Sequence, residues 1–367
     1  MSRWAWAEVS ASAIAHNVRT LADLAAPAQV WAVVKADGYG HGAVLAARAA
    51  QAGGAHGLCV ALVQEGVQLR EAGVQGPILV LSEQPSTQTT MAIAAGLQLT
   101  VYSADGLAAI AAAGAHDHPV HLKIDTGMRR VGATGHETVA LAQAIVASPA
   151  TRLEGVFTHL AVADEPQNPF TGQQLARFDE ALARLAAAGV QPPLVHAANS
   201  AGALAHPRAR YGMVRVGIAI YGISPGPGVD HLCTDLRPAL SLHARVSHVK
   251  RVGAGERISY GLRHTFAADA TVATLPLGYA DGVPRRLHAV GGTVLLGGGH
   301  RPIVGVVTMD QLMVDCGDDP VQVGDDAVLI GSQGGHTITA GDWAERLDTI
   351  AYEIVCGISA RVERRAT

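Results

Sequence analysis

The chain has 367 residues, a length that predicts one large domain and a smaller one rather than a single small module. Hydrophobic residues make up 49% and charged residues 16%, and this balance excludes an extended disordered chain. The 27 Lys and Arg against 31 Asp and Glu give a formal net charge of −4, with no basic block, so we expect neither a nucleic acid nor a membrane as a partner.

Cysteine usage and the N-terminus indicate a cytoplasmic protein. Cys59, Cys233, Cys316 and Cys356 lie far apart without CxxC spacing, which is typical of reduced thiols rather than a disulfide framework. Residues 1–10 contain no apolar core of a signal peptide, and the Ala-rich stretches are interrupted before they reach the length of a membrane span. The 17 histidines are scattered without HExxH spacing, so no metal site is expected.

The first two thirds of the chain alternate short apolar runs with longer Ala- and Leu-rich runs. The apolar runs predict eight strands, at residues 30–35, 57–62, 77–81, 97–102, 120–124, 155–160, 194–197 and 214–219. Helical spacing between them predicts helices at residues 43–51, 137–147 and 173–188. Eight strands, each followed by a helix, predict an α/β fold of the (β/α)8 TIM-barrel type, with a doubly wound open sheet as the alternative.

After about residue 238 the helical spacing fades. Val-rich runs separated by Gly-rich turns predict a mainly β domain, with strands at residues 242–249, 270–277, 293–296, 303–307 and 327–330. Residues 225–228 (PGPG) are expected to form the linker, and residues 4–9 a strand that joins the second domain. We therefore assign residues 10–235 to the barrel and residues 236–367, with 1–9, to the C-terminal β domain.

Polar side chains follow the predicted barrel strands, at the end of the barrel where such enzymes hold their active sites. Lys35 ends the first apolar run, and the Gly-rich loop 38–42 (GYGHG) follows it. A lysine beside a desolvated core has a lowered pKa and can act as a Schiff-base nucleophile, although its position also fits a lysine that leaves a strand for solvent. The later strand ends carry Lys123, Arg130, His159, His196, Asn199, Ser200 and Arg215.

Residues 33–42 (VVKADGYGHG) resemble the pyridoxal-phosphate lysine motif of alanine racemases. Further matches follow in the same order along essentially the whole chain, at residues 123–130, 154–159, 196–201, 214–218, 259–261, 277–282, 308–311 and 352–354. Several ordered motifs are more specific than any one of them, and the chain is identified as a member of the alanine racemase family. The resemblance implies a two-base racemase that interconverts L-alanine and D-alanine and supplies D-alanine for peptidoglycan.

By this resemblance, Lys35 would hold pyridoxal phosphate as a Schiff base and act as the base on one face of the substrate, with Tyr260 as the base on the other. Racemisation needs a proton acceptor on each face. A phenol is a poor base at neutral pH, and His159 is the neighbour expected to support it. In the family this tyrosine comes from the second subunit, which implies a homodimer with shared active sites.

The resemblance places Arg215 against the pyridine nitrogen, with His196 behind it as an orienting residue. Arginine keeps its proton, so the ring nitrogen would stay unprotonated and the ring would be a weaker electron sink. A surface ion pair is the other role considered for Arg215. The groups expected around the cofactor phosphate are Tyr39, Ser200, Gly217, Ile218 and Tyr352. Ser200, after Asn199 at the start of a helical run, also fits a plain N-cap.

By the same resemblance, Arg130 would contact the cofactor's phenolic oxygen and the substrate carboxylate. The backbone N–H of the partner subunit's Met309 would be a second carboxylate donor, with Asp310 next to it in its motif. Lys123 resembles a family lysine that CO2 carboxylates, and the resulting carbamate would pair with Arg130. Without that modification, Asp125 or a bound anion would have to balance the charge. The residues expected at the entrance are Tyr279, Arg285 and Asp164, beside Tyr260, Tyr352 and Val162.

Three residues depart from the family pattern: Arg129 replaces a usual glycine, Val306 a frequent basic residue and Thr308 a common cysteine. A serine or broad-specificity amino-acid racemase of the same family remains the main alternative. A pyridoxal-phosphate decarboxylase would be expected to carry an acidic residue in place of Arg215. A non-catalytic protein that binds the same cofactor would leave the C-terminal third, with Tyr260, unexplained.

Overall fold

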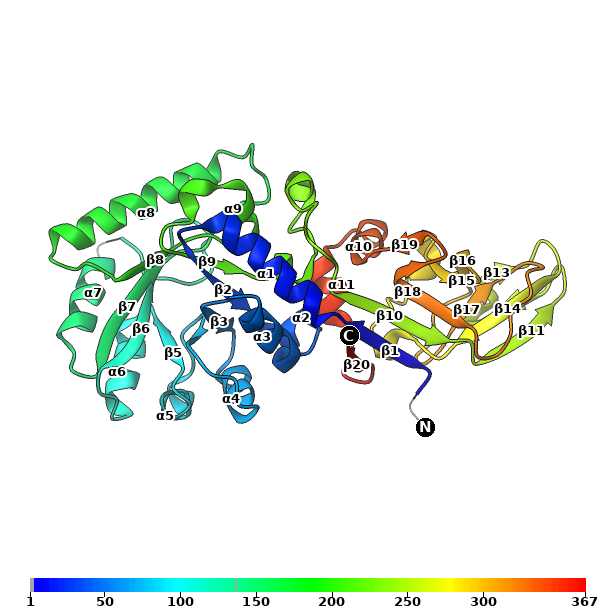
Figure 1. Ribbon diagram of the computed structural model, residues 1–367, viewed down its shortest axis with the longest axis horizontal. Helices are drawn as coiled ribbons and strands as arrows, with labels where there is room; N and C mark the ends of the chain where they lie inside the picture. Colours follow the sequence, from blue (N-terminus) through cyan, green and yellow to red (C-terminus); the bar gives the residue numbers. More distant parts are fainter. Residues whose placement is uncertain (1–2, 136) are drawn as a thin grey trace. The chain divides into compact units, whose positions relative to one another are not determined.

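The computed structural model describes residues 3–135 and 137–367. The chain divides into two compact units, one formed by Ser12–Arg237 and the other by Pro238–Thr367 together with the N-terminal residues up to Ala11. Figure 1 shows strands ringed by helices in the first unit and a strand-rich second unit.

The first unit is a closed barrel of eight parallel strands, which confirms the predicted barrel and excludes the open sheet. Its strands are β2 (Gln29–Val33), β3 (Gly57–Val60), β4 (Ile78–Val80), β5 (Gln98–Val101), β6 (His118–Lys123), β7 (Thr151–Phe157), β8 (Leu194–His196) and β9 (Met213–Val216). The barrel closes between β2 and β9, where Trp31 lies beside Arg215 in the register. The first and last strand ends therefore meet at the same mouth.

Helices surround these strands. The α-helices are α1 (Ala11–Ala25), α2 (Lys35–Tyr39), α3 (Ala43–Ala52), α4 (Val63–Glu71), α5 (Thr89–Ala94), α6 (Ala104–Ala112), α7 (Glu137–Ala147), α8 (Phe170–Ala187) and α9 (Ser200–Ala205). Short 3-10 turns are η1 (Ser86–Gln88), η2 (Pro207–Ala209), η3 (Ile218–Tyr221) and η4 (Pro227–Leu232). Helix α8 buries Leu175, Phe178 and Leu185 along the stripe that the spacing predicts.

The second unit is built on a ten-stranded sheet, with strand order β11-β14-β17-β16-β15-β18-β10-β1-β20 and β19 paired to β18. Its strands are β1 (Ala5–Val9), β10 (Leu240–Arg245), β11 (His248–Val252), β14 (Ala270–Leu275), β15 (Thr293–Leu296), β16 (Gly299–Val304), β17 (Leu312–Asp315), β18 (Asp326–Gln333), β19 (His336–Ile338) and β20 (Glu363–Ala366). A separate hairpin joins β12 (Arg257–Ile258) to β13 (His264–Thr265). Strand β1 pairs with β10 and β20, which confirms that the N-terminal strand joins this unit.

Helical elements that the sequence pattern did not predict interrupt the second unit. They are η5 (Tyr260–Leu262), η6 (Tyr279–Asp281), η7 (Leu287–Val290), α10 (Ala340–Leu347) and α11 (Ala351–Gly357). Thr339 begins α10 with a capping box, because its hydroxyl accepts from the Asp342 N–H and the Asp342 carboxylate accepts from the Thr339 N–H. The sequence thus contains this helix-start motif, and the helix forms although the surrounding residues have a strand-like pattern.

The expected linker at residues 225–228 is wrong. This stretch lies inside the barrel unit and leads into η4, while the division between the units falls at Arg237 and Pro238. Gly226 and Gly228 pack on the segment around Asp164: a Cβ at Gly228 would lie 2.3 Å from the Asp164 carbonyl oxygen. Alternating Pro and Gly here serve close packing rather than flexibility.

Candidate active site

Lys35 lies at the mouth of the barrel, on a loop of unusual handedness. The strand ends at Val33, not at Lys35 as predicted, because residues 36–39 take left-handed backbone angles, with φ between +52° and +62°. Such a turn is costly for residues other than glycine. Two carboxylates support it: Glu65 accepts from the Ala36 N–H at 2.7 Å, and Asp37 accepts from the Ala43 N–H at 2.8 Å.

Tyr39, Ser200 and Gly217 form a close cradle at the same mouth. The Ser200 hydroxyl accepts from the Gly217 N–H at 2.9 Å, immediately before Ile218 begins η3. A Cβ on Gly217 would lie 2.4 Å from the Tyr39 hydroxyl, so only glycine allows this approach. Asn199, not Ser200, is the N-cap of α9, since its side chain accepts from the Gly202 N–H. The plain N-cap expected of Ser200 is therefore wrong.

Arg215 is buried in the barrel, with 3% of its surface exposed. Its Nη1 lies 2.7 Å from Nδ1 of His196, and its Nη2 donates to the carbonyl oxygens of Thr158 and Ala197 at 2.8 and 3.0 Å. Nδ1 of His159 lies 3.3 Å from the same Nη2. Burial lowers the pKa of Arg215 to about 10, which still leaves it protonated at neutral pH. The surface ion pair considered for Arg215 is thus excluded.

His121 and Gln98 extend the series of hydrogen bonds that begins with Arg215 and His196. His196 Nε2 lies 2.9 Å from Nδ1 of His121, and His121 Nε2 lies 2.9 Å from Oε1 of Gln98. Both imidazoles are fully buried, and burial followed by the charge of Arg215 holds their pKa values well below the usual histidine range. Both rings are therefore neutral at physiological pH.

Lys123 ends β6 and is buried among cations. Its Nζ donates to the Leu81 carbonyl at 3.3 Å and lies 5.4 Å from the ring centroid of Phe157. Burial, followed by the charges of Arg215, Arg130 and Lys35, lowers its pKa from 10.5 to about 7, while Asp125 acts in the opposite direction. A substantial fraction of this amine is thus uncharged at neutral pH.

The loop after β6 carries Arg130 and closes over a small cavity that Lys123, Asp125, Arg130 and His159 help to line. The Asp125 carboxylate accepts from the N–H groups of Gly127 and Arg129. Arg129 has φ +59°, a left-handed angle that favours glycine, which accounts for the usual family glycine; nothing in the structure explains the arginine that replaces it here. Burial and the surrounding cations also lower the pKa of His159. The excess of positive charge suits an anionic ligand.

The other predicted site residues belong to the second unit. Tyr260, Tyr279 and Met309 are exposed, by 72%, 42% and 53%. Tyr352 lies on α11 and is half-buried, and Arg285 is exposed after η6. Val306, which replaces an expected basic residue, is buried. In the barrel unit, Asp164 and Val162 are half-buried. The convergence of the two sets of residues remains a prediction.

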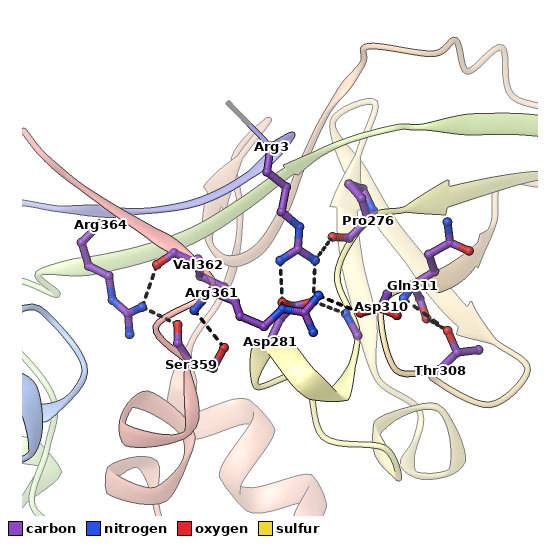
Figure 2. Close-up of polar contacts among 11 residues, drawn as sticks. Arg3, Pro276, Asp281, Thr308, Asp310, Gln311, Ser359, Arg361, Val362 and Arg364 are labelled. Atoms are coloured by element: carbon purple, nitrogen blue, oxygen red, sulfur yellow. Dashed lines mark hydrogen bonds and ion pairs between the residues drawn. The ribbon is translucent and has the colours of Figure 1, made fainter. Parts of the chain in front are cut away.

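Figure 2 shows a charged cluster in which Asp281 and Asp310 contact Arg3 and Arg361. Asp281 and Asp310 are close in sequence to Tyr279 and Met309. The Asp281 carboxylate is fully buried and accepts hydrogen bonds from Nη1 and Nη2 of Arg3, at 2.5 and 2.6 Å. It also accepts from the Gly278 N–H at 3.0 Å. Arg361 contacts Asp281 at 3.4 Å and Asp310 at 2.7 Å (Figure 2).

Backbone hydrogen bonds join the same two loops. The N–H of Tyr279 donates to the Thr308 carbonyl at 2.9 Å, and the N–H of Ala280 donates to the Met309 carbonyl at 3.0 Å. Thr308, which departs from the family pattern, closes a turn with Gln311 through its hydroxyl (Figure 2). Hydrogen bonds thus connect the loop of Tyr279, the predicted entrance residue, to the loop of Met309, the predicted carboxylate donor.

Sequence reasoning missed His121, Gln98 and the pair of Arg3 with Asp281. Residues two apart in a strand share a face, so His121 could have been found from Lys123. The contact of Arg3 with Asp281 spans 278 residues, and no local pattern indicates it. Across residues 3–135 and 137–367, no group of His, Cys, Asp and Glu could hold a metal ion. In the same described part of the chain, no helix is long and apolar enough to cross a membrane.

Comparison with known proteins covers the chain almost end to end. Residues 9–225 match the family described as alanine racemase, N-terminal domain, and residues 239–366 match alanine racemase, C-terminal domain. An alanine racemase of Symbiobacterium thermophilum is 50% identical over 363 residues, covering 98% of this chain and 96% of that protein. One of Geobacillus stearothermophilus is 42% identical over 364 residues, covering 98% and 92%.

Solved structures of racemases have the same fold as this chain. The crystal structure of alanine racemase from E. faecalis has a TM-score of 0.94 and 40% identity, and the match covers 100% of this chain and 98% of that one. A histidine racemase from Leuconostoc mesenteroides has a TM-score of 0.92 and 29% identity, with 100% and 98% coverage. The chain is thus similar to amino-acid racemases in both of its units.

Proposed function

This chain belongs to the alanine racemase family, and from that premise we propose that it interconverts L-alanine and D-alanine with pyridoxal phosphate as cofactor. The observation that carries the proposal is the pairing of β2 with β9, which brings Lys35 to the mouth where Arg215 lies. The charges of both residues act on the buried thiol of Cys59, so both lie near it. A lysine and a buried arginine at one barrel mouth suit an aldehyde cofactor with an aromatic nitrogen.

The donor groups at the mouth fit the cofactor. The hydroxyls of Tyr39 and Ser200 and the N–H groups of Gly217 and Ile218 would hold its phosphate, in a cradle too close for a Cβ at Gly217. Tyr352 would add a third hydroxyl. Phosphate is commonly held by such hydroxyl and backbone N–H donors.

Two bases would move the proton. When bound, pyridoxal phosphate would withdraw electrons from the substrate α-carbon and make its proton more acidic. Nζ of Lys35 would take or return this proton on one face, and the phenol oxygen of Tyr260 of the partner subunit on the other. Tyr260 is 72% exposed, so its phenol is accessible to a neighbouring chain, as a homodimer with shared sites would require. His159, whose Nδ1 faces Arg215, would support that phenol.

Arg215 would act by keeping its proton. At a pKa of about 10 it donates at neutral pH and leaves a facing ring nitrogen without a proton. His196 orients the guanidinium from behind. This arrangement favours return of the α-proton over loss of the substrate carboxylate, and so favours a racemase over a decarboxylase.

Arg130 and the N–H of the partner subunit's Met309 would bind the substrate carboxylate, and Asp310, next to Met309, is paired with Arg361. We extend the proposal to Lys123, whose uncharged amine can attack CO2 to form a carbamate while its proton is released to solvent. The lowered pKa of Lys123 supports this step, and the resulting anion would pair with Arg130.

We propose alanine as the substrate because three tyrosines, Tyr260, Tyr279 and Tyr352, would crowd the site, with Arg285 and Asp164 at the entrance. The product D-alanine would serve cell-wall peptide synthesis in the cytoplasm. The similarity to a histidine racemase keeps a broader amino-acid racemase, including one for serine, as the second candidate.

The test is chiral chromatography of the products from a panel of L-amino acids, with purified protein and added pyridoxal phosphate. We expect D-alanine to form fastest; faster racemisation of serine or histidine would favour the second candidate. An absorption band of the lysine-bound cofactor should be present in wild type and lost in Lys35→Ala. Protein that stays colourless after reconstitution would contradict the proposal.

The chain offers a matched control, because Lys35, Lys123 and Lys250 are its three lysines. Lys250 is exposed on β11, and Lys250→Ala should keep both the band and the activity. Borohydride reduction followed by peptide mass spectrometry should find the cofactor on Lys35 and not on Lys250.

A further inference from the structure

Ser259, directly before Tyr260, has a backbone conformation that side chains rarely adopt. Its angles are φ +66° and ψ −178°, in a region that belongs almost entirely to glycine. A non-glycine residue stays there only where the surrounding structure holds it, and such strain concentrates at functional sites. The contacts of Ser259 therefore matter more than those of an ordinary loop serine.

Two contacts hold Ser259 from the side of the sheet. Its hydroxyl donates to the Val306 carbonyl at 2.8 Å. Gly305, which follows β16, packs directly on it: a Cβ at Gly305 would lie 2.5 Å from the Ser259 Cβ. Glycine at position 305 thus lets the two segments touch.

The residues on either side continue the support. Ile258 packs against the buried cluster that contains Phe266 and Val304, and it pairs with His264 in the β12–β13 hairpin. Beyond the kink, the Leu262 N–H donates to the Ser259 carbonyl at 3.0 Å. Tyr260 therefore stands exposed on a short turn whose base is fixed in the core of the second unit.

We infer that Ser259 is a positioning residue, which holds the kink that directs the phenol of Tyr260. The inference rests on the proposed function, in which Tyr260 is one of the two bases. If residue 259 relaxed to an ordinary extended conformation, the next side chain would point elsewhere. Proton transfer requires hydrogen-bond reach between base and substrate, so a small displacement of Tyr260 lowers the rate.

Two substitutions separate the hydrogen bond from the strain. Ser259→Ala keeps the Cβ, and hence the strain, but removes the hydroxyl that holds the kink. Ser259→Gly also removes the hydroxyl but takes this conformation without strain. We expect kcat for alanine to fall about tenfold or more in Ser259→Ala, with KM within about twofold of wild type. In Ser259→Gly, kcat should be at least about threefold higher than in Ser259→Ala.

The order of the variants distinguishes positioning from packing. Loss of packing alone would rank Ser259→Gly below Ser259→Ala in kcat and in denaturation midpoint, because glycine removes more contacts. Positioning predicts the reverse order in both. The matched control is Ser247→Ala in the same unit, where the hydroxyl also donates to a backbone carbonyl, that of Thr274 at 3.0 Å. Its kcat should stay within about twofold of wild type.

An isotope effect adds a readout specific to one base. The two enantiomers of alanine have equal free energy, so kcat/KM must fall equally in both directions. The α-deuterium isotope effect can differ, and in Ser259→Ala it should rise for the enantiomer whose proton Tyr260 removes. Unchanged kcat in both variants, or Ser259→Gly below Ser259→Ala, overturns the role of Ser259. A wild type without racemase activity overturns the proposed function itself.

Discussion

Arg215 donates from Nη1 to Nδ1 of His196 over 2.7 Å, and this contact fixes the tautomers of two histidines. Arginine has no acceptor, so the proton of the neutral His196 ring lies on Nε2. That proton points to Nδ1 of His121, and His121 in turn donates from Nε2 to Oε1 of Gln98. The hydrogen bonds thus all run in one direction through four residues, from Arg215 to Gln98 at the start of β5.

The first prediction concerns this series of hydrogen bonds. His121→Phe would leave the buried Nε2–H of His196 without its acceptor, and we expect the free energy of unfolding to fall by about 1–3 kcal/mol. His121→Gln, whose amide oxygen can accept, should lose less. Urea denaturation measures the difference, and 15N NMR should show Nε2–H tautomers in wild type. Equal stability of the Phe and Gln variants would contradict the prediction.

The second prediction concerns Lys123. Its pKa is lowered from 10.5 to about 7 on folding, so between these pH values the unfolded chain binds more protons than the folded one. Stability should therefore rise with pH above 7, by about 1.4 kcal/mol per pH unit from this group. Lys123→Met should remove that rise.

The Lys123 measurement is urea denaturation from pH 7 to 9 in CO2-depleted buffer, so that the amine stays unmodified. Cys59, whose pKa burial raises to about 12, affects the slope at higher pH and is common to both proteins. Lys250→Met serves as the comparison for loss of an exposed lysine. If stability rises equally with pH in Lys123→Met and in wild type, the Lys123 amine does not titrate between pH 7 and 9, and the prediction is wrong.

The third prediction concerns the buried pair of Arg3 and Asp281. Burial alone would raise the pKa of Asp281, but the Arg3 guanidinium and the Gly278 N–H hold it below the ordinary value. The pair should thus stabilise the fold above the unfolded pKa, and this contribution should be lost as pH falls through the folded pKa. Asp281→Asn should cost about 3 kcal/mol at neutral pH.

A matched surface pair calibrates this cost. Arg251 and Asp318 meet at 2.5 Å in the same unit, but both are exposed, and Asp318→Asn should change stability by less than about 1 kcal/mol. Because Asp281 supports the loops of Tyr279 and Met309, its substitution should also raise KM for alanine. Equal losses for the two Asn variants would show that burial of Asp281 is unimportant.

The fourth prediction concerns Gly217. In Gly217→Ala the new methyl group would meet the Tyr39 hydroxyl at 2.4 Å, so the cradle that we propose for the phosphate must open. We expect the dissociation constant of pyridoxal phosphate, followed by absorbance, to rise by about tenfold or more. Gly172→Ala in α8, where the added Cβ meets none of the described atoms within 4 Å, should leave binding intact and stabilise the helix by about 0.5–1 kcal/mol.

The sequence predicted the barrel because its strands are short apolar runs at regular intervals, and the helix from Phe170 because its apolar residues recur at helical spacing. It missed the end of β2 at Val33, since four consecutive left-handed residues have no propensity signal apart from Gly38. Helix α10 was missed although Thr339 and Asp342 form a capping box, because β texture surrounded it.

Site residues divided in the same way. Lys35, Lys123 and Arg215 were predicted as site residues because strand ends and motifs mark them. His121 could have been predicted only by following the strand alternation from Lys123. No local pattern could indicate the role of Arg3, because its partner Asp281 lies 278 residues further along the chain. The sequence shows Ser259 only as part of the motif at residues 259–261, because its backbone angles cannot be predicted from residue types.

Closure of the barrel between its first and last strands sets the order in which the site can arise during synthesis. Lys35 leaves the ribosome early, but β2 has no neighbour on one edge until β9 has emerged with Arg215. A nascent chain that ends before Met213 therefore exposes two open strand edges, which are prone to aggregation. Cofactor capture should follow release of the last barrel strand, and truncation upstream of it should yield insoluble protein rather than a weaker enzyme.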